Sequence, residues 1–465
     1  MGCYSLDILK MSHNNLSGEI FLESVNLTRI HFMSIDNNQF TGKIGQGLRR
    51  LESLDTLDIS NNNLTGVIPS WIGQIPYLSS LLLSNNSLEG EIPVSLFNID
   101  LLDLSANMLS GGIPSFVSYI SPRVLLLQGN NLSGAIPNSL LVNVTVLDLS
   151  NNRLSGNIPE FINSQSINIL LLRGNNLTGR IPHQLCGLCN IKLLDLSKNR
   201  LNESIPSCLS NLSFGFGKEE DTDDDIYVLS FSLRGTLSVY FKSLVVEDQF
   251  FKKCKALTLT TIQFATKHRY DAYIGGNLRL LFGLGLSENE LTGEIPVELG
   301  DLLQVQALNL SHNKLSGMIP KSFSGLKNVE SLDLSFNRLQ GPIPPQLTDL
   351  SSLAVFNLSY NNLSGVIPQG KQFNTFDTQS YLGNPFLCGK PTNTSCNNNT
   401  FQETDNGVEA DESTIYMVSF YWSFAAAYVT ILLGIFAFLS FDSPWSRFWL
   451  YIVDAFIHKV RNLLW

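Results

Sequence analysis

Four residues near the middle of the chain have the types and spacing of a metal site. His183, Cys186, Cys189 and Cys208 supply one imidazole and three thiols, the side chains that bind zinc. A disulfide is the alternative, because Cys186 and Cys208 lie 22 residues apart, about one unit of the repeat described below. Stacked repeats would bring both within bridging distance, and an oxidising compartment favours the bond. We therefore predict a Cys186–Cys208 disulfide, with no metal and no cofactor.

The other cysteines suggest a second disulfide. The chain has seven cysteines, so at least one has no partner within the chain. Cys388 and Cys396 enclose a short segment after the last repeat, and a bond between them would stabilise that end by about 2 to 4 kcal/mol. Cys189 and Cys254 are a further candidate pair, which would leave Cys3 over.

Two segments resemble catalytic motifs but lack their essential residues. Gly283 and Gly285 begin a GxG, yet Glu288 stands where a nucleotide-binding loop needs a third glycine. The stretch HRYD at 268–271 is followed by no DFG and by too few residues for a kinase domain. The net charge of −10, from 40 acidic and 30 basic residues, also argues against nucleic acid as a partner. We predict that the chain is not an enzyme.

A repeat of about 24 residues positions most of these side chains. The text LDISNNNLTGVIP at Leu57–Pro69 returns with small changes at Leu81–Pro93 and Leu308–Pro320. Its alternating leucines would point inward from a short strand, and one unit cannot bury them alone, so the units must stack into a solenoid. The inward asparagine needs hydrogen bonds to neighbouring backbones, which a ladder would supply. Thirteen copies align on this residue: Asn14, Asn38, Asn62, Asn86, Asn107, Asn130, Asn152, Asn175, Asn199, Asn289, Asn313, Asn337 and Asn361.

These patterns point to a family. The pattern LxxLxLSxNxLxGxIP resembles the plant extracellular type of leucine-rich repeat, and the stretch QGKQFNTFDTQSYLGNPFLCGKP at 369–391 is similar to the end of plant leucine-rich-repeat receptor-like proteins. The resemblance implies an α/β leucine-rich-repeat solenoid, with short parallel strands on the concave face and 3-10 or irregular structure on the convex side, plus one transmembrane helix. It also implies an extracellular sensor that lacks a kinase, of the disease-resistance or developmental type.

The N-terminus departs from that family. Met1–Ile20 already lies in a repeat and contains no basic region followed by an apolar stretch. The family would have a signal peptide, a cysteine-bearing cap and further repeats there, so we expect an N-terminal truncation. The predicted organisation is nine repeats at 1–206, an insertion at 207–277, four repeats at 278–368, a cap at 369–400, an acidic segment at 401–413, a membrane span at 414–441 and a cytoplasmic tail at 442–465.

The insertion fills the long gap between Asn199 and Asn289. It combines the acidic run KEEDTDDD at 218–225 with strand-forming residues at 256–266. The resemblance implies an island domain in which a lysine and a tyrosine six residues later help to recruit a co-receptor kinase. Lys267 and Tyr273 match that spacing. The alternative is a surface lysine and a half-buried tyrosine.

A second set of candidate contacts lies in the last four repeats. The residue before the aligned asparagine is mostly small or polar, but here it becomes Glu288, His312, Phe336 and Tyr360. Exposed aromatic residues in a column are candidates for an interface with a co-receptor or ligand. Alternatively, Phe336 and Tyr360 merely cover their own strands.

The segment Thr414–Phe441 has 28 residues without a charge, which is long enough for a transmembrane helix. Basic residues follow it and acidic residues precede it, which predicts a single-pass type I protein of the plasma membrane with the repeats outside. Ala426, Thr430 and Gly434 offer a small-residue surface for another helix. The tail reads as an amphipathic helix on the inner leaflet, with an unstructured tail as the alternative.

Sequons for N-glycosylation agree with passage through the secretory pathway. Several of them arise automatically from the repeat text NNLSG or NLS. They begin at Asn15, Asn26, Asn63, Asn85, Asn131, Asn143, Asn176, Asn202, Asn211, Asn309, Asn357, Asn362, Asn393 and Asn398.

The first functional hypothesis is a non-enzymatic receptor for an extracellular peptide, protein or glycan. A tail of 24 residues is too short for an enzyme domain, so signalling would require receptor kinase co-receptors and adaptor kinases. The alternative is a truncated decoy or non-functional remnant of such a receptor. A secreted repeat inhibitor of microbial enzymes is disfavoured by the predicted span.

Overall fold

The computed structural model describes residues 5–20, 27–115, 122–160, 166–212, 261–266, 269–274, 281–392 and 394–396. All of them belong to the compact unit Met1–Cys396, which is separate from a second unit, Asn397–Trp465. The predicted span at 414–441, its small-residue surface and the tail at 442–465 lie outside the described residues. Within the described part of the chain, no helix has the length and apolar character needed to cross a membrane.

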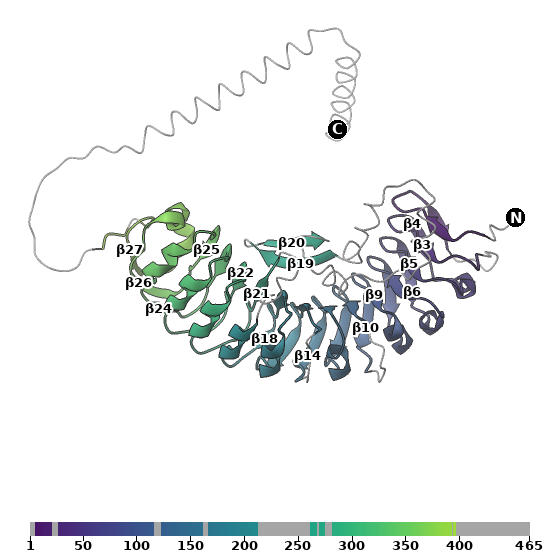
Figure 1. The fold of residues 1–465 in the computed structure, drawn as a ribbon, viewed down its shortest axis with the longest axis horizontal. Helices are drawn as coiled ribbons and strands as arrows, with labels where there is room; N and C mark the ends of the chain where they lie inside the picture. Colours follow the sequence, from purple (N-terminus) through teal and green to yellow (C-terminus); the bar gives the residue numbers. More distant parts are fainter. Residues whose placement is uncertain are drawn as a thin grey trace, which may run out of the picture. The chain divides into compact units, whose positions relative to one another are not determined.

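The concave face is a parallel sheet with one strand from each of the thirteen predicted repeats (Figure 1). Each repeat thus forms one coil, and the predicted solenoid is confirmed. In chain order, which is also the order in the sheet, the strands are β1 (Ile8–Lys10), β3 (Phe32–Ser34), β5 (Thr56–Asp58), β7 (Ser80–Leu82), β9 (Leu101–Asp103), β11 (Val124–Leu126), β13 (Val146–Asp148), β15 (Ile169–Leu171), β17 (Leu193–Asp195), β21 (Gly283–Gly285), β22 (Ala307–Asn309), β23 (Ser331–Asp333) and β25 (Val355–Asn357).

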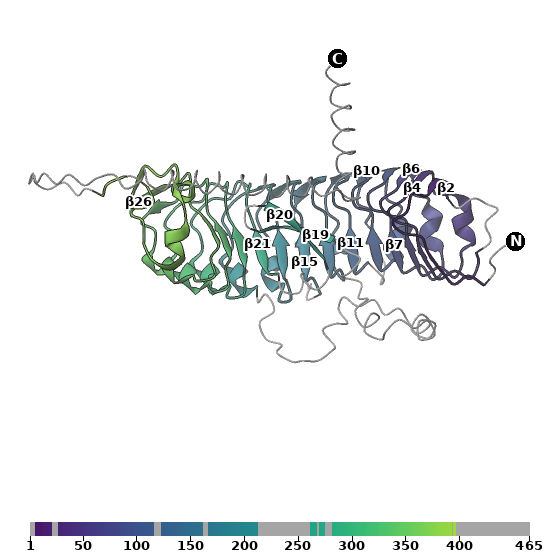
Figure 2. The same ribbon diagram turned by 90° about the horizontal axis from the view of Figure 1, so that it is seen from above.

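A second parallel sheet, which the sequence analysis did not predict, runs along the coils beside the first (Figure 2). The residues after the aligned asparagine form it, with the leucine buried and its neighbours exposed, as in Asn63–Val67. Its nine strands are β2 (Ser17–Glu19), β4 (Gln39–Gly42), β6 (Asn63–Val67), β8 (Ser87–Gly90), β10 (Met108–Gly112), β12 (Asn131–Gly134), β14 (Arg153–Asn157), β16 (Asn176–Gly179) and β18 (Arg200–Leu201). A terminal sheet adds β24 (Gln340–Gly341), β26 (Asn362–Val366) and β27 (Phe386–Cys388).

The convex side carries 3-10 helices, as expected. The proline that ends the repeat text caps most of them, because its φ is fixed near −65° and it has no N–H to satisfy. Pro69, with φ −67°, caps η2 and directs Ile72 into the core. The helices are η1 (Gln46–Arg50), η2 (Ser70–Gln74), η3 (Val94–Asn98), η4 (Asn138–Leu141), η5 (His183–Gly187), η6 (Ser207–Asn211), η10 (Val297–Asp301), η11 (Lys321–Gly325), η12 (Pro345–Asp349), η13 (Lys371–Thr375) and η14 (Thr378–Tyr381).

The core contains the expected leucine columns and the asparagine ladder. Leu57, Ile59 and Leu64 are fully buried. Asn62 donates from Nδ2 to the carbonyl oxygens of Ile35, Ile59 and Ser60 at 3.0 to 3.2 Å. Its Oδ1 accepts from the backbone N–H of Phe40 at 3.0 Å. One amide thus satisfies backbone groups of two neighbouring coils that would otherwise be buried without partners.

The predicted cap begins as a continuation of the repeat. Asn384 makes the ladder bonds of a fourteenth coil, donating to Leu358 O and accepting from Leu363 N–H at 3.0 Å each. The strand β27 pairs with β26, so the coil is completed on that side. On the concave side, η14 replaces an inner strand and ends the sheet. A disulfide joins Cys388 to Cys396, with Cα atoms 5.1 Å apart.

The insertion contributes a hairpin, β19 (Thr261–Thr266) and β20 (Arg269–Ile274). The strand-forming text at 256–266 therefore contains a strand, whereas the acidic run at 218–225 lies outside the described residues. The boundary predicted at residue 206 falls too early, because η6 and the buried Leu212 still belong to the repeat. The inner sheet continues without a break, since β17 pairs directly with β21.

Candidate ligand and partner surfaces

The residue before each ladder asparagine has a left-handed backbone. From His13 to Tyr360, all thirteen such residues have φ between 49° and 69°. This conformation is accessible to glycine and tolerated by asparagine, but it strains most other side chains. The backbone thus explains why this column is rich in Asn and Gly in the first nine coils.

The last three coils place aromatic rings at these positions and stack them. His312 and Phe336 have ring centroids 4.1 Å apart, and Phe336 and Tyr360 lie 4.3 Å apart, with interplanar angles of 12° and 19°. Phe336 is 40% exposed and Tyr360 45% exposed. These three residues form what we call the aromatic stack. Glu288 precedes them in the same column, so the structure aligns the four residues that the sequence singled out.

An open groove of about 830 Å³ runs beside the same column in the preceding coils. Gly129 and Gly174 leave room for it, because they place no side chain on the column. Its lining is polar and includes Asn131, Arg153 and Asn176 from the first positions of strands in the second sheet. The groove was not predicted from the sequence, because it is formed by two neighbouring columns of residues rather than by one.

The hairpin docks on the concave face (Figure 1). Phe264 is 1% exposed, and its ring lies over Gly283, where an added Cβ would come within 2.2 Å of it. Ile262 is also buried. Both belong to an apolar cluster on the inner sheet that also comprises Leu82, Leu101, Val124, Leu126, Val146, Ile169, Leu171, Leu193, Leu281 and Ala307.

Tyr273 lies within the hairpin and is half-buried against this cluster. A hydrogen bond of 2.5 Å joins its hydroxyl to Thr266 Oγ1. This environment resembles the structural alternative considered for Tyr273. Lys267, its predicted companion, lies outside the described residues.

A contact that sequence reasoning missed holds β20 to the inner sheet. The guanidinium of Arg173 lies 3.5 Å from the ring centroid of Tyr270. The Tyr270 hydroxyl lies 3.3 Å from Ser197 Oγ, in hydrogen-bond distance. Burial raises the pKa of Tyr270 to about 12. The only sequence signal was an arginine where most repeats have serine.

Buried carboxyl groups form a second column on the concave face. Burial raises the pKa of Asp58 to about 6 and that of Asp148 to about 7, and it also raises the pKa of Asp103 and Asp195. Hydrogen bonds from the serine two residues later oppose this shift. Asp58, for example, accepts from the N–H and Oγ of Ser60.

Comparison with known proteins places this architecture. The family model for "Leucine rich repeat" matches residues 22–88 and 279–339, and a second one for "Leucine Rich Repeat" matches 143–164, 166–188 and 190–212. Receptor-like protein 15 of Arabidopsis thaliana is 75% identical over 296 residues, which cover 61% of this chain and 31% of that protein. Receptor-like protein 13 is 69% identical over 286 residues, covering 61% and 26%.

The chain is thus similar to plant receptor-like proteins and contains leucine-rich repeats. It spans less than a third of the length of these two curated relatives. Among solved structures, it is similar to the plant peptide hormone receptor RGFR1 in complex with RGF2, with a TM-score of 0.60, 29% identity and coverage of 83% of this chain and 56% of that one. It is also similar to the ectodomain of the Arabidopsis thaliana receptor kinase GASSHO1/SCHENGEN3 in complex with CASPARIAN STRIP INTEGRITY FACTOR 2. That comparison has a TM-score of 0.50 and 26% identity, and it covers 85% of this chain and 49% of that one.

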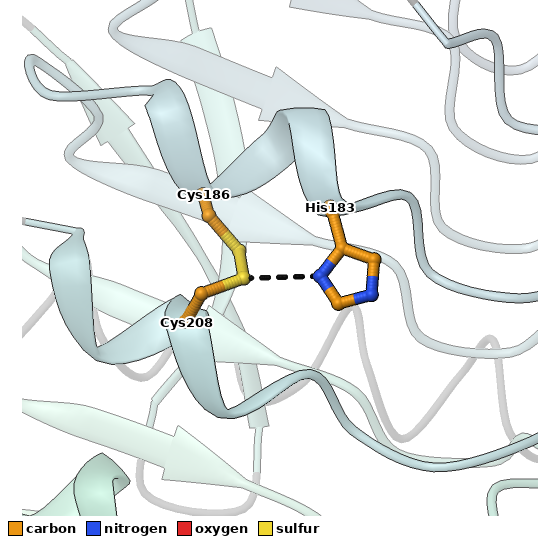
Figure 3. A group of neighbouring side chains, drawn as sticks. All are labelled: His183, Cys186 and Cys208. Atoms are coloured by element: carbon orange, nitrogen blue, oxygen red, sulfur yellow. Dashed lines mark hydrogen bonds between the residues drawn. A yellow bond between two sulfur atoms is a disulfide. The ribbon is translucent and has the colours of Figure 1, made fainter.

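A disulfide occupies the cysteine and histidine cluster (Figure 3). Cys186 on η5 and Cys208 on η6 are bonded, with Cα atoms 5.6 Å apart, and His183 Nδ1 lies 3.3 Å from Cys208 Sγ. Metal ligation by cysteine requires a thiolate, which bonded sulfurs do not provide. The donor set for zinc is therefore incomplete in this state. Cys189 is exposed nearby, while Cys3 and Cys254 lie outside the described residues.

The predicted glycosylation sequons lie in different structural settings. Asn15, Asn63, Asn85, Asn131, Asn143, Asn176, Asn202, Asn211 and Asn362 are exposed, whereas Asn309 and Asn357 are half-buried on inner strands. Asn26, Asn393 and Asn398 lie outside the described residues.

Proposed function

We propose that the chain is the sensing part of a non-enzymatic plasma-membrane receptor, single-pass and type I. It binds an extracellular peptide, protein or glycan and signals through receptor kinase co-receptors and adaptor kinases, in plant defence or development. Relatedness to receptor-like proteins and similarity to a peptide hormone receptor in complex with its hormone support this proposal.

The observation that carries the partner-binding part is the aromatic stack. Bulky residues in the left-handed region each cost roughly 1 to 2 kcal/mol, and packing inside the core does not explain them, because their rings are partly exposed. Flat, rigid, exposed rings are the groups that dominate protein interfaces. We assign the stack, together with Glu288, to co-receptor docking.

The concave face serves ligand binding in this proposal. The hairpin already covers part of its apolar surface, so Tyr273 acts by holding the hairpin in place rather than by direct contact. Lys267 remains a candidate contact with the co-receptor. The segment Thr414–Phe441, with Ala426, Thr430 and Gly434 on one face, provides the span through which a kinase partner would associate.

Co-immunoprecipitation of the tagged full-length chain with co-expressed receptor kinases, tested one at a time, examines this proposal. The double variant F336N/Y360N should lose at least tenfold in association, because exposed interface rings are worth about 2 kcal/mol or more each. Tyr77→Ala is the matched control, since Tyr77 is a 70% exposed aromatic outside the stack. The proposal would be contradicted if the wild type, F336N/Y360N and Tyr77→Ala all associated equally with the kinases. It would also be contradicted if the wild type associated with none of the kinases tested.

A further inference from the structure

The same sequon text occurs in two different structural settings. Asn63, Asn131, Asn176 and Asn362 are each the first residue of a strand, in the second or the terminal sheet. In each strand, the asparagine is exposed and the following leucine is buried. The serine or threonine after the leucine lies on the same side of the strand as the asparagine. Asn15 is exposed at the equivalent repeat position. These five residues form what we call the outer row.

Asn309 and Asn357 have the N-L-S text of Asn15, Asn131 and Asn362, but they end inner strands. Asn309 Oδ1 accepts from the backbone N–H and the Oγ of Ser311, at 3.0 and 2.7 Å. Asn357 Oδ1 accepts from the N–H of Ser359 at 3.0 Å. Both serines are about 95% buried. The sequon is therefore used internally by the fold.

The position of these two asparagines supports that interpretation. Other coils have an aspartate there, and its carboxylate makes the same bonds, as Asp103 does with the N–H and Oγ of Ser105. The amide at Asn309 thus replaces a carboxylate that orders the turn after the strand. This position requires a side-chain oxygen that accepts hydrogen bonds, and a sugar attached to the amide would interfere with those bonds.

We propose that N-linked glycans attach to the outer row and not to Asn309 or Asn357, and that the sugars on Asn131 and Asn176 occupy the open groove. Both asparagines line that groove, with Arg153 between them and Arg200 one coil further on. Guanidinium groups present several N–H donors, which suit the hydroxyl and amide oxygens of a sugar. The inference rests on the proposed function, because it needs passage through the secretory pathway.

The same row explains which surface stays open to a partner. In the three coils after the hairpin, the equivalent residues are Glu290, Lys314 and Arg338, none of which can accept an N-glycan. Glu290 and Lys314 form an ion pair of 2.8 Å there. The glycans on Asn131 and Asn176 therefore cover the groove, whereas His312 and Phe336 of the aromatic stack lie in coils without an outer-row asparagine.

Glycopeptide mass spectrometry of the full-length chain, purified from plant membranes, tests the attachment sites. We expect occupancy at the five asparagines of the outer row, and none at Asn309 or Asn357. Glycans on either inner-strand asparagine, or bare Asn131 and Asn176 beside other occupied sequons, would overturn the inference. If no sequon is modified, the proposed extracellular location fails as well, so the two failures are distinguishable.

A second measurement tests whether the sugars fill the groove. Lys198 lines the groove and is exposed, so its amine reports on shielding. Labelling with an amine reagent should rise at least threefold in N131Q/N176Q but stay unchanged in N63Q/N362Q, which removes two glycans of the same row elsewhere. Equal labelling in both double variants would overturn this part. N309D/N357D, which installs the usual aspartate, should show no shift in gel mobility, and a shift would count against the inference.

Discussion

The nine coils before the hairpin and the four after it share one backbone but expose different chemistry. Both groups have the same ladder bonds and the same left-handed residue before the asparagine. Before the hairpin, that residue is mostly an amide, glycine or alanine. The last residue of the inner strands alternates between aspartate and leucine from β5 to β17. After it, the column turns charged and aromatic. The difference shows that a solenoid lets its buried framework and its exposed columns vary independently.

The largest expected effect tests whether the framework is truly shared. Asn152→Ala and Asn313→Ala each remove an amide that bonds to three carbonyl oxygens and one N–H. Each should lower the free energy of unfolding by about 3 to 4 kcal/mol, because several buried backbone groups lose their partners. Urea unfolding measures the change, with the exposed Asn157→Ala as control. A difference above about 1 kcal/mol between the two variants would show that the regions do not share one framework.

The hairpin divides the two regions, and its docking can be broken at one residue. Phe264→Ala removes a buried ring that packs over Gly283 and should weaken docking by about 3 kcal/mol. The core beneath should stay folded, because its leucine columns do not include the hairpin. Limited proteolysis should therefore cut near residues 261–274 faster, while the circular dichroism melt changes little. Gln263→Ala, on the same strand but exposed, is the control.

Acid–base behaviour should differ between the regions as well. Burial raises the pKa of Asp148 to about 7, so the folded state favours its protonated form. That stabilisation is complete below the unfolded pKa of about 4 and is lost as the pH rises through about 7. Asp148→Asn installs the amide found at Asn309 and Asn357, which does not titrate. Between pH 5 and pH 8, the free energy of unfolding should therefore fall by about 2 kcal/mol less in this variant than in the wild type. An unchanged pH dependence of unfolding would show that Asp148 does not titrate in this range.

The smallest effect concerns the strained column. Phe336→Asn and Tyr360→Asn give the later coils the residue that Asn37 and Asn61 supply in the earlier ones, and asparagine tolerates the left-handed region. The relief of strain is partly offset by lost stacking, so stability should rise by less than about 1 kcal/mol per variant. Differential scanning calorimetry measures it. A clear loss of stability would assign the aromatic stack to folding instead of docking.

The sequence was sufficient for the repeating framework, and the reason is physical. Leucine spacing and the aligned asparagine are set by burial, so all thirteen inner strands could be placed in advance. Asn384 was missed although it follows Asn361 by 23 residues, because its coil carries one extra residue between asparagine and leucine. The second sheet was missed because its strands show too few alternations to stand out.

The candidate surfaces were only partly predictable. A column is visible in the sequence as a repeat position, which is why Glu288, His312, Phe336 and Tyr360 could be singled out. The stacking distances, the groove and the contact of Arg173 with Tyr270 join residues whose separation in sequence carries no period. The two uses of N-L-S are identical as text and differ only in which strand contains them.

The direct pairing of β17 with β21 also bears on how the chain folds. Elsewhere paired positions of neighbouring inner strands lie about 24 residues apart in the sequence, but here Asp195 and its partner Gly285 lie 90 residues apart. Closing the longer loop in the unfolded chain costs about 1 kcal/mol more in entropy. Folding in a solenoid propagates from neighbour to neighbour, so we expect propagation to slow at this junction. The molecule should therefore acquire its structure as two cooperative blocks that meet between β17 and β21.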